Sequence, residues 1–373
     1  MNFDFSEDEK HLREEAERFL RDRCPRTRVR QVLETGADYD PDLWRNVAAL
    51  GWTGLGIPEA YGGLGMSPLE ACVLAEALGG ALAPLPTVPS VYVVTDALVR
   101  MGSEAQKRKW LPRLASGETI GALAVSEGDG IPDLARLAAV VDGASLSGVK
   151  RSVPAGMIAD LVIVVAVDRG EPGLFLADLS DATVVRTREI SIDPTRSHAT
   201  LSFTDVPAER LGAGDARAAL ESILVRAAVL TAFEQVAGAE AALQMARNYA
   251  LERFAFGRPI GSFQAIKHKL ADVVVATTLA RSNAYFAAST LAADDEALPM
   301  AAACARVSAS KAFDLASQEN LHVHGGAGYT WEVDCHLYYR RARELSLVLG
   351  SSRAWKERIA CGLEARHSRL GDV

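Results

Sequence analysis

Two arginines flank a tight turn in the segment ALERFAFGRPIGSFQAIKHKLAD, residues 250–272. Arg253 and Arg258 stand on either side of a Phe-Gly pair, and Gln264 begins the next helical pattern. Guanidinium groups match phosphate oxygens, and the first amides of a helix have no partner within the helix. The segment is a candidate pyrophosphate site, although a plain helix–helix corner with exposed arginines would show the same spacing.

A second candidate is ENLHVHGGAGYTWEVD, residues 319–334. A helix is expected to end at His324, and the glycines that follow let backbone approach a ligand closely, or only stop the helix. His322 and His324 are two residues apart and lie on opposite sides of a helix, which argues against a shared metal ion. The sequence therefore predicts no metal site here.

A third candidate is Ser126 in LAVSEGDG, residues 123–130. A hydroxyl at the end of a strand can bond a heterocycle, but by itself this signal has little specificity.

The elements that position these residues change in type along the chain. Residues 1–117 predict helices that open at Ser/Asp caps. The expected starts are Ser6 with Glu9, in a helix through about Arg23, then Asp40-Pro41, Ser67-Pro68, and Ser103 with Gln106.

Residues 118–212 contain short β-branched runs with Gly, Asp and Pro between them, which predicts a small antiparallel sheet or barrel. The runs are IGALAVS, RLAAVVDG, ASLSGVK, ADLVIVVAV, GLFLADL and HATLSFTDV. Residues 213–373 return to helical spacing, with helices expected at about 216–251, 262–292, 298–323, 333–347 and 352–366. The fold class is thus α+β: an N-terminal α-helical domain (1–117), a middle β domain (118–212) and a C-terminal four-helix bundle (213–373).

Composition excludes several classes of protein. The 373 residues are 49% hydrophobic and carry a formal net charge of -8, so the basic excess of nucleic-acid-binding proteins is absent. No apolar run is long enough to span a membrane, and the acidic start does not look like a signal peptide. The five scattered cysteines predict reduced thiols and a cytoplasmic protein.

Taken together, these segments resemble the acyl-CoA dehydrogenase family over essentially the whole chain. The likeness is carried by FSEDEKHLREEAERFL, LGIPEAYGGLGMS, LAVSE, GVK, ALERFAFGRPIGSFQAIKHKLAD, HGGAGYTWE and LYYRRA. The resemblance implies FAD bound at a subunit interface of a homotetramer or a heterotetramer of related subunits. It also implies oxidation of an acyl-CoA thioester to its 2,3-enoyl form, with electrons passed to an electron-transfer flavoprotein.

The resemblance also assigns cofactor-binding residues by position. Arg253, Phe256 and Gln264 match groups that hold the FAD pyrophosphate and adenosine across the interface. Gly325 and Gly326 match backbone that meets the adenine half of a neighbouring subunit's FAD, and His322 stands where the family usually has Gln. Ser126 matches a Ser or Thr at the flavin ring, and Ser351 follows the glycine of the Gly-Thr position.

The expected catalytic base is missing from this pattern. Family chemistry removes a proton α to the thioester carbonyl and needs a carboxylate in reach of it. In most relatives this is a Glu before the Gly-Thr pair, and that position holds Leu349. A minority place the Glu on the long helix, near Ala227 here. Glu234, seven residues further on, is the remaining substitute, with a packing or ion-pair role as its alternative.

Two further departures affect the flavin and substrate side. Ser152-Val153-Pro154 replaces a flavin-packing Trp-Ile-Thr, and residues 128–132 (GDGIP) replace a substrate-binding Gly-Ser-Asp stretch. The interface half of the FAD site is therefore better kept than the flavin half.

Three interpretations remain open. The chain is the subunit without a base in a heteromeric acyl-CoA dehydrogenase; or a flavoenzyme of monooxygenase or desulfinase type that needs no base; or a homomeric enzyme that uses a base such as Glu234, or a structural paralogue with little activity.

Overall fold

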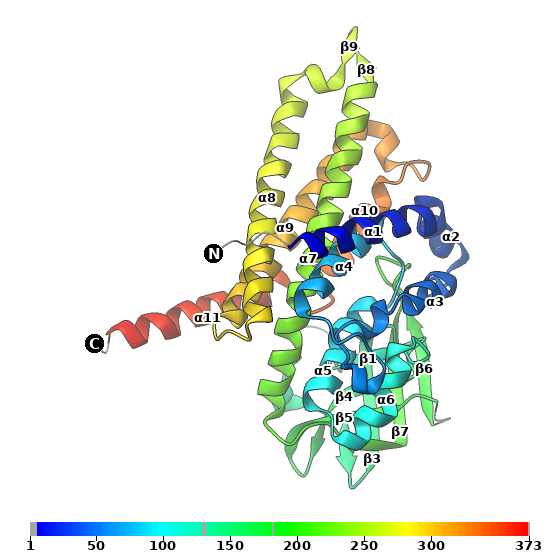
Figure 1. Ribbon diagram of the computed structural model, residues 1–373, viewed down its shortest axis with the longest axis vertical. Helices are drawn as coiled ribbons and strands as arrows, with labels where there is room; N and C mark the ends of the chain where they lie inside the picture. The colour runs from blue at the N-terminus through cyan, green and yellow to red at the C-terminus, as the bar shows by residue number, and fades with distance from the viewer. Residues whose placement is uncertain (1–5, 129–131, 181–182, 372–373) are drawn as a thin grey trace. The chain divides into compact units, whose positions relative to one another are not determined.

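The computed structural model describes residues 6–128, 132–180 and 183–371 (Figure 1). Close contacts divide the chain into two compact units, each built from separate stretches of sequence. We call residues 1–29, 68–83 and 228–373 the helical unit, and residues 30–67 and 84–227 the β-containing unit. The division into three domains at 117 and 212 follows composition rather than contacts, and it stays a prediction.

The helix starts expected from capping residues are confirmed. Ser6 and Glu9 bond each other's backbone amides in a capping box, and Ser103 and Gln106 do the same. Asp40 accepts a hydrogen bond of 2.9 Å from the amide of Leu43, with a proline in the first turn of that helix. These helices begin as predicted because each cap is satisfied by residues only three positions away.

The fourth expected start is confirmed too, since α4 begins at Pro68, directly after Ser67. One helical element of this region has no such local signal. A proline-rich, β-branched run from residue 86 forms a π-helix and continues into an α-helix, and it is almost wholly buried. Burial overrides the weak helix propensity of its valines and threonines. The helical elements before the sheet are α1 Glu7–Arg23, α2 Arg26–Thr35, α3 Pro41–Ala49, η1 Trp52–Gly54, η2 Glu59–Tyr61, α4 Pro68–Ala81, η3 Val88–Thr95, α5 Asp96–Met101 and α6 Glu104–Ala115.

The strands of the β-containing unit form a closed set of pairings. Strand β4 pairs with β2, β2 with β3, β3 with β7, β7 with β5, and β5 again with β4, while β1 joins β4 and β6 joins β7. The middle β region is confirmed, and of the two alternatives, a small antiparallel sheet or a barrel, the closed pairings match the barrel. Most of its pairings are antiparallel, but β1–β4 and β2–β4 are parallel. The strands are β1 Gly121–Ala124, β2 Val140–Asp142, β3 Ser145–Pro154, β4 Leu161–Asp168, β5 Glu171–Asp178, β6 Val184–Glu189 and β7 His198–Arg210.

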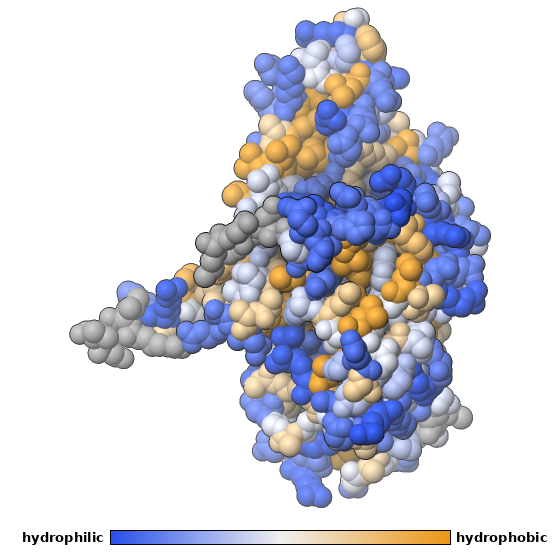
Figure 2. Space-filling view, viewed as in Figure 1, coloured by the Kyte–Doolittle hydropathy of each residue, from blue (hydrophilic) through white to orange (hydrophobic). Residues whose placement is uncertain are grey.

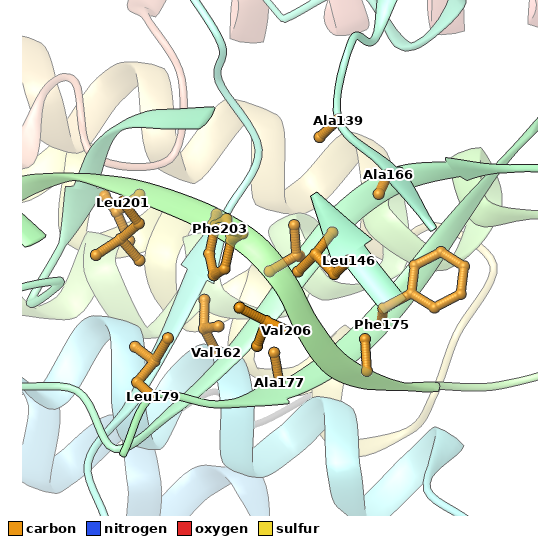
Figure 3. Close-up of a cluster of buried hydrophobic side chains, with 14 of the residues drawn as sticks. Ala139, Leu146, Val162, Ala166, Phe175, Ala177, Leu179, Leu201, Phe203 and Val206 are labelled. Atoms are coloured by element: carbon orange, nitrogen blue, oxygen red, sulfur yellow. The ribbon is translucent and has the colours of Figure 1, made fainter. Parts of the chain in front are cut away.

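The interior of this barrel is filled by small and branched side chains. Figure 3 shows Leu146, Val162 and Val206, from three different strands, gathered between the ribbons, and all three are fully buried. Strand β6 contributes little to this interior, because none of its residues is buried and it pairs only with β7 among the described strands. That lack of a buried face is why the sequence did not predict it.

The helices expected after residue 213 are confirmed. In the helical unit α9 packs against α8, α10 and α11, and Figure 1 shows α7 and α8 running alongside each other to a shared turn. No helix among the described residues is both long and apolar enough to cross a membrane. The elements are α7 Ala216–Glu252, β8 Phe254–Ala255, β9 Arg258–Pro259, η5 Ile260–Ser262, α8 Gln264–Ala292, α9 Leu298–His324, η6 Gly325–Tyr329, α10 Cys335–Leu345 and α11 Ser352–Gly371.

Candidate functional site

The turn between α7 and α8 is a two-residue hairpin. Strands β8 and β9 pair across Phe256 and Gly257, which have φ values of 53° and 78°. Positive φ at both central positions is the hairpin geometry that matches strand twist. The ring of Phe256 is 95% exposed at the tip of this turn, so its strained backbone presents an aromatic group outward.

The same turn presents positive charge without a carboxylate partner. Among the described residues neither Arg253 nor Arg258 forms an ion pair, although Arg258 lies 4.1 Å over the ring of Phe263. Helix α8 begins at the exposed Gln264 without a side-chain cap, so its first two amides, of Gln264 and Ala265, are left for another acceptor. A helix N-terminus beside two such guanidiniums can hold a phosphate or pyrophosphate.

The glycines after α9 leave backbone open to a ligand. Gly325 has a φ of 60°, and a Cβ placed on Gly325 or Gly326 would meet no described atom within 4 Å. His322 is half exposed, with Nδ1 3.4 Å from Glu319, whereas His324 is buried and bonds the carbonyl of Asn320 at 2.8 Å. Burial lowers the pKa of His324. No group of three or more metal-ligating side chains occurs in the ranges described.

The hairpin and the glycine turn lie at the same end of the helical unit. Val323 of α9 packs in one apolar cluster with Ala246 and Ala250 near the end of α7, and Ile260 and Ile266 cover it. Nearby, the ammonium of Lys269 in α8 bonds the carboxylate of Glu319 in α9 at 2.6 Å. Two segments predicted separately from sequence are thus brought to one place by packing.

Ser126 belongs to the β-containing unit, in the loop that follows β1. It is half buried, its carbonyl accepts a bond of 2.8 Å from the amide of Arg151, and its hydroxyl bonds no other described residue. Residues 129–131, within the stretch expected to replace the substrate-binding loop, lie outside the described residues.

Ser152, on the strand that holds this loop, has an unusual backbone conformation. Its φ is 51°, at a register shift in the β3–β7 pairing. Glu189 accepts bonds from both its amide, at 3.1 Å, and its hydroxyl, at 2.8 Å. Sequence reasoning missed Glu189 because β6 was not expected.

The loop after α10 buries Leu349. This side chain is 5% exposed, and its carbonyl accepts a bond of 3.1 Å from the indole of Trp355. Gly350 follows with a φ of 99°, and the hydroxyl of Ser351 accepts a bond of 3.3 Å from the amide of Ala354 in the first turn of α11. Ser351 therefore caps a helix, while its role toward a cofactor stays a prediction.

Glu234 is completely buried in α7 and faces a guanidinium. Arg306 of α9 bonds Gln235, Ser310 and the carbonyl of Leu345. Burial lowers the pKa of Arg306 to about 10, against the negative charges of Glu344 and Glu234. We call Glu234, Gln235, Arg306, Ser310 and Glu344 the Arg306 cluster. The role of Glu234 as a substitute base stays a prediction.

Arg306 was missed from sequence, although an arginine within the small apolar run AAACARVSAS was a usable signal.

The donor set at the α7–α8 hairpin fits a dinucleotide: two guanidiniums, uncapped helix amides and an open glycine backbone at one end of the helical unit. The guanidiniums and amides suit a pyrophosphate, and the open backbone suits an adenine ring that lies against it.

Comparison with known proteins assigns the family. The model for the acyl-CoA dehydrogenase N-terminal domain matches residues 6–118, and that for the C-terminal domain matches residues 216–363. The chain belongs to the acyl-CoA dehydrogenase family, a family of FAD-dependent oxidoreductases. The resemblance inferred from the motifs is confirmed.

Similar proteins and structures extend over nearly the whole chain. Acyl-CoA dehydrogenase IpdE2 of Mycobacterium tuberculosis is 34% identical over 333 residues, which is 89% of either chain. A structure described as a variant of the Tcur3481-Tcur3483 steroid ACAD is 31% identical, with a TM-score of 0.87 over 97% of this chain and 99% of that one. A chain of the ChsE4-ChsE5 complex from Mycobacterium tuberculosis is 27% identical, with a TM-score of 0.89 over 98% of this chain and 99% of that one. The expected fold is confirmed.

Proposed function

We propose that this chain takes part in FAD-dependent α,β-dehydrogenation of an acyl-CoA thioester as the subunit that lacks the catalytic base. The observation that carries this proposal is the contrast between two places in the helical unit. Among the described residues the pyrophosphate-type donors at the α7–α8 hairpin have no carboxylate partner, whereas the position expected for the base holds the buried, apolar Leu349. Such a chain can hold FAD but supplies no proton acceptor at that loop.

The residues divide the work on FAD between binding and orientation. Arg253 and the first amides of α8 hold the pyrophosphate of a neighbouring subunit's FAD across the interface, and Phe256 and the Gly325-Gly326 backbone lie against its adenosine half. Ser126 offers its hydroxyl to the flavin ring. Bound FAD would supply the hydride acceptor for the β-carbon of the acyl chain. The α-proton requires a carboxylate that the Leu349 loop does not contain.

A related subunit is the proposed source of that carboxylate. The names of two similar structures each give a pair, Tcur3481-Tcur3483 and ChsE4-ChsE5. Helix α8 offers a surface for such a partner: Val275, Leu279 and Phe286 lie on one face and are 58, 61 and 46% exposed. Figure 2 shows this apolar area along α8 below the hairpin. Exposed apolar side chains in one stripe are typical of a protein–protein contact.

The alternative base within this chain receives less support. Glu234 is completely buried, and its negative charge raises the pKa of the buried Arg306, so a proton acceptor there would lie away from solvent and beside a guanidinium. Removing one of two interacting buried charges is costly.

The test compares the chain produced alone with the chain produced together with a related, co-encoded acyl-CoA dehydrogenase subunit. Each preparation is mixed anaerobically with steroid-derived and short straight-chain acyl-CoA esters, and the loss of flavin absorbance is followed. We expect the pair to be yellow and to bleach with at least one ester, and the lone chain not to bleach.

Bleaching by the lone chain would contradict the proposal and favour a base within this chain, such as Glu234. Turnover that consumes oxygen without an electron-transfer flavoprotein would instead favour a base-independent flavoenzyme. The matched variant is Leu349→Glu in this chain of the pair, which should not raise the rate of bleaching, because the pair already has its base.

A further inference from the structure

Three successive residues of the loop that carries Ser126, residues 125–127, each accept a hydrogen bond from β3. The carbonyl of Val125 accepts from the ammonium of Lys150 at 3.2 Å, and the carbonyl of Ser126 accepts from the amide of Arg151 at 2.8 Å. The carboxylate of Glu127 accepts from Lys150 at 2.6 Å. Adjacent residues of β3 thus hold adjacent residues of the loop.

Glu127 is also held from its other side. Its two carboxylate oxygens accept from the backbone amides of Ala138 and Ala139 at 2.6 and 3.0 Å. Burial would raise the pKa of Glu127, but the bonds from Lys150 and the two amides hold it below its usual value. The carboxylate therefore stays charged and joins the loop, β3 and residues 138–139, which directly precede β2.

Lys150 is unusual because its side chain has no exposed surface. Burial lowers its pKa, against the hydrogen bond and charge of Glu127. Lysines are almost never fully buried unless paired. If this position only had to fill the barrel, an apolar side chain would pack there without a charge to desolvate. A charge is costly to desolvate, so its burial here points to a role other than packing.

The placement of the Ser126 hydroxyl follows from these bonds. A serine side chain has one rotatable bond, so the position of Oγ is set by the backbone to within its staggered rotamers. Ser126 is bonded through its own carbonyl and through both of its neighbours, yet its hydroxyl has no partner in the described parts of the chain. A rigid loop with one free hydroxyl is suited to bond a ligand.

We propose that the Glu127–Lys150 ion pair is a positioning pair, which fixes the Ser126 hydroxyl for its contact with the flavin ring of FAD. This inference rests on the proposed function, in which Ser126 meets the flavin. Glu127 and Lys150 do not touch FAD themselves; they act through the backbone of residues 125–127.

The test is a mutant cycle on the FAD-loaded assembly of this chain with its related subunit. The variants are Lys150→Met, Glu127→Gln and Ser126→Ala, with Lys150→Met and Ser126→Ala also combined. Affinity is measured by quenching of FAD fluorescence, and flavin surroundings are measured by the visible absorbance band. Hydrogen exchange of the amides in the peptide covering 121–128 reports the rigidity of the loop.

A matched control comes from another ion pair of the same unit. Asp38 bonds Arg188 at 2.6 and 2.8 Å, and its side chain is 18% exposed, the same fraction as that of Glu127. Asp38→Asn should alter stability without altering FAD affinity, the flavin band or exchange in 121–128.

We expect Lys150→Met and Glu127→Gln each to speed exchange in 121–128 by about tenfold, as loss of a charge-assisted hydrogen bond implies. Each should weaken FAD binding about fivefold, because one neutral hydrogen bond to FAD is lost. Each should also shift the flavin absorbance band as Ser126→Ala does. The combined variant should bind FAD no more weakly than Ser126→Ala alone, because both changes remove the same contact.

Two results would overturn the inference while the proposed function stands. In one, Lys150→Met weakens FAD binding by the same factor with and without the Ser126 hydroxyl. In the other, hydrogen exchange in 121–128 becomes faster, but FAD affinity and the flavin absorbance band do not change. If Lys150→Met does not fold, Glu127→Gln with Ser126→Ala gives the same cycle. A wild-type assembly that binds no FAD would contradict the proposed function itself.

Discussion

Two adjacent glycines at the end of α4 give the sharpest test of the packing. A Cβ on Gly79 would lie 2.2 Å from the carbonyl oxygen and 2.4 Å from the Cα of Glu234 in α7, both of them backbone atoms. A Cβ on Gly80 would lie 3.8 Å from the Cβ of Ala237, which is ordinary contact. We therefore expect Gly79→Ala to destabilise the helical unit and Gly80→Ala to stabilise it.

The magnitude follows from opposing effects. Alanine in place of glycine within a helix lowers the free energy of folding by about 0.5–1 kcal/mol. Forcing a methyl group into a packed contact costs about 1–3 kcal/mol, and the upper end applies at Gly79 because backbone cannot rotate away. The ion pair of Glu76 in α4 with Arg281 in α8, at 2.6 Å, also resists separation of α4 from its neighbours. Gly79→Ala should lose about 2 kcal/mol net, and the two variants should differ by about 3 kcal/mol.

The assay is thermal unfolding of the helical signal in circular dichroism, with wild type and both variants at equal concentration. About 2 kcal/mol corresponds to a midpoint about 4–8 °C lower for a unit of this size. Gly79→Ala unfolding at or above the temperature of Gly80→Ala would refute the close approach of α4 and α7.

The remaining predictions concern charge. Leu349→Glu should unfold more easily as pH rises from about 5 to 8, because burial raises the pKa of the introduced carboxyl and the folded state then binds more protons than the unfolded state. A pH series of denaturation midpoints checks this, and the midpoint of Leu349→Gln should not change with pH over that range. Arg306→Met should cost about 3–5 kcal/mol of unfolding free energy by leaving the carboxylates of the Arg306 cluster without their counter-charge, and an equal midpoint for Arg306→Met and Arg306→Lys would contradict that reason. Arg253→Met should weaken FAD about 10–100-fold in a fluorescence titration, as loss of a charge-assisted bond implies, while the exposed Arg217→Met should not. Glu127→Gln should be less stable than wild type at pH 7 and converge with it near pH 3, because the lowered pKa of Glu127 gives stability above its unfolded pKa of about 4.5 that is lost as the carboxylate is protonated.

Most elements could be predicted because their signals are local. The capping boxes at Ser6 and Ser103 involve residues three positions apart, and the Phe-Gly turn at 256–257 joins strands next to it in sequence. Strand β6 and the π-helix at 88–95 could not be predicted, since their conformations depend on what they pair with or are buried against. The parallel pairing of β4 with β1 and β2 likewise depends on strands far apart in sequence.

The candidate site divides in the same way. The sequence alone identified the family motifs, the arginine-flanked hairpin, the glycine turn after α9, and the leucine where relatives carry their base. It could not place the hairpin beside the glycine turn, because the contacts of Val323 with Ala246 and Ala250 span more than 70 positions.

Tertiary structure also decided which polar residues are buried and with whom. The Glu127–Lys150 pair and the Arg306 cluster have no pattern in the sequence that separates them from charged residues at the surface. Residue type and spacing determine which helices, turns and binding groups can form. Whether a charge faces water, a partner or a ligand is determined only when distant segments pack, since the cost of burying it depends on what surrounds it.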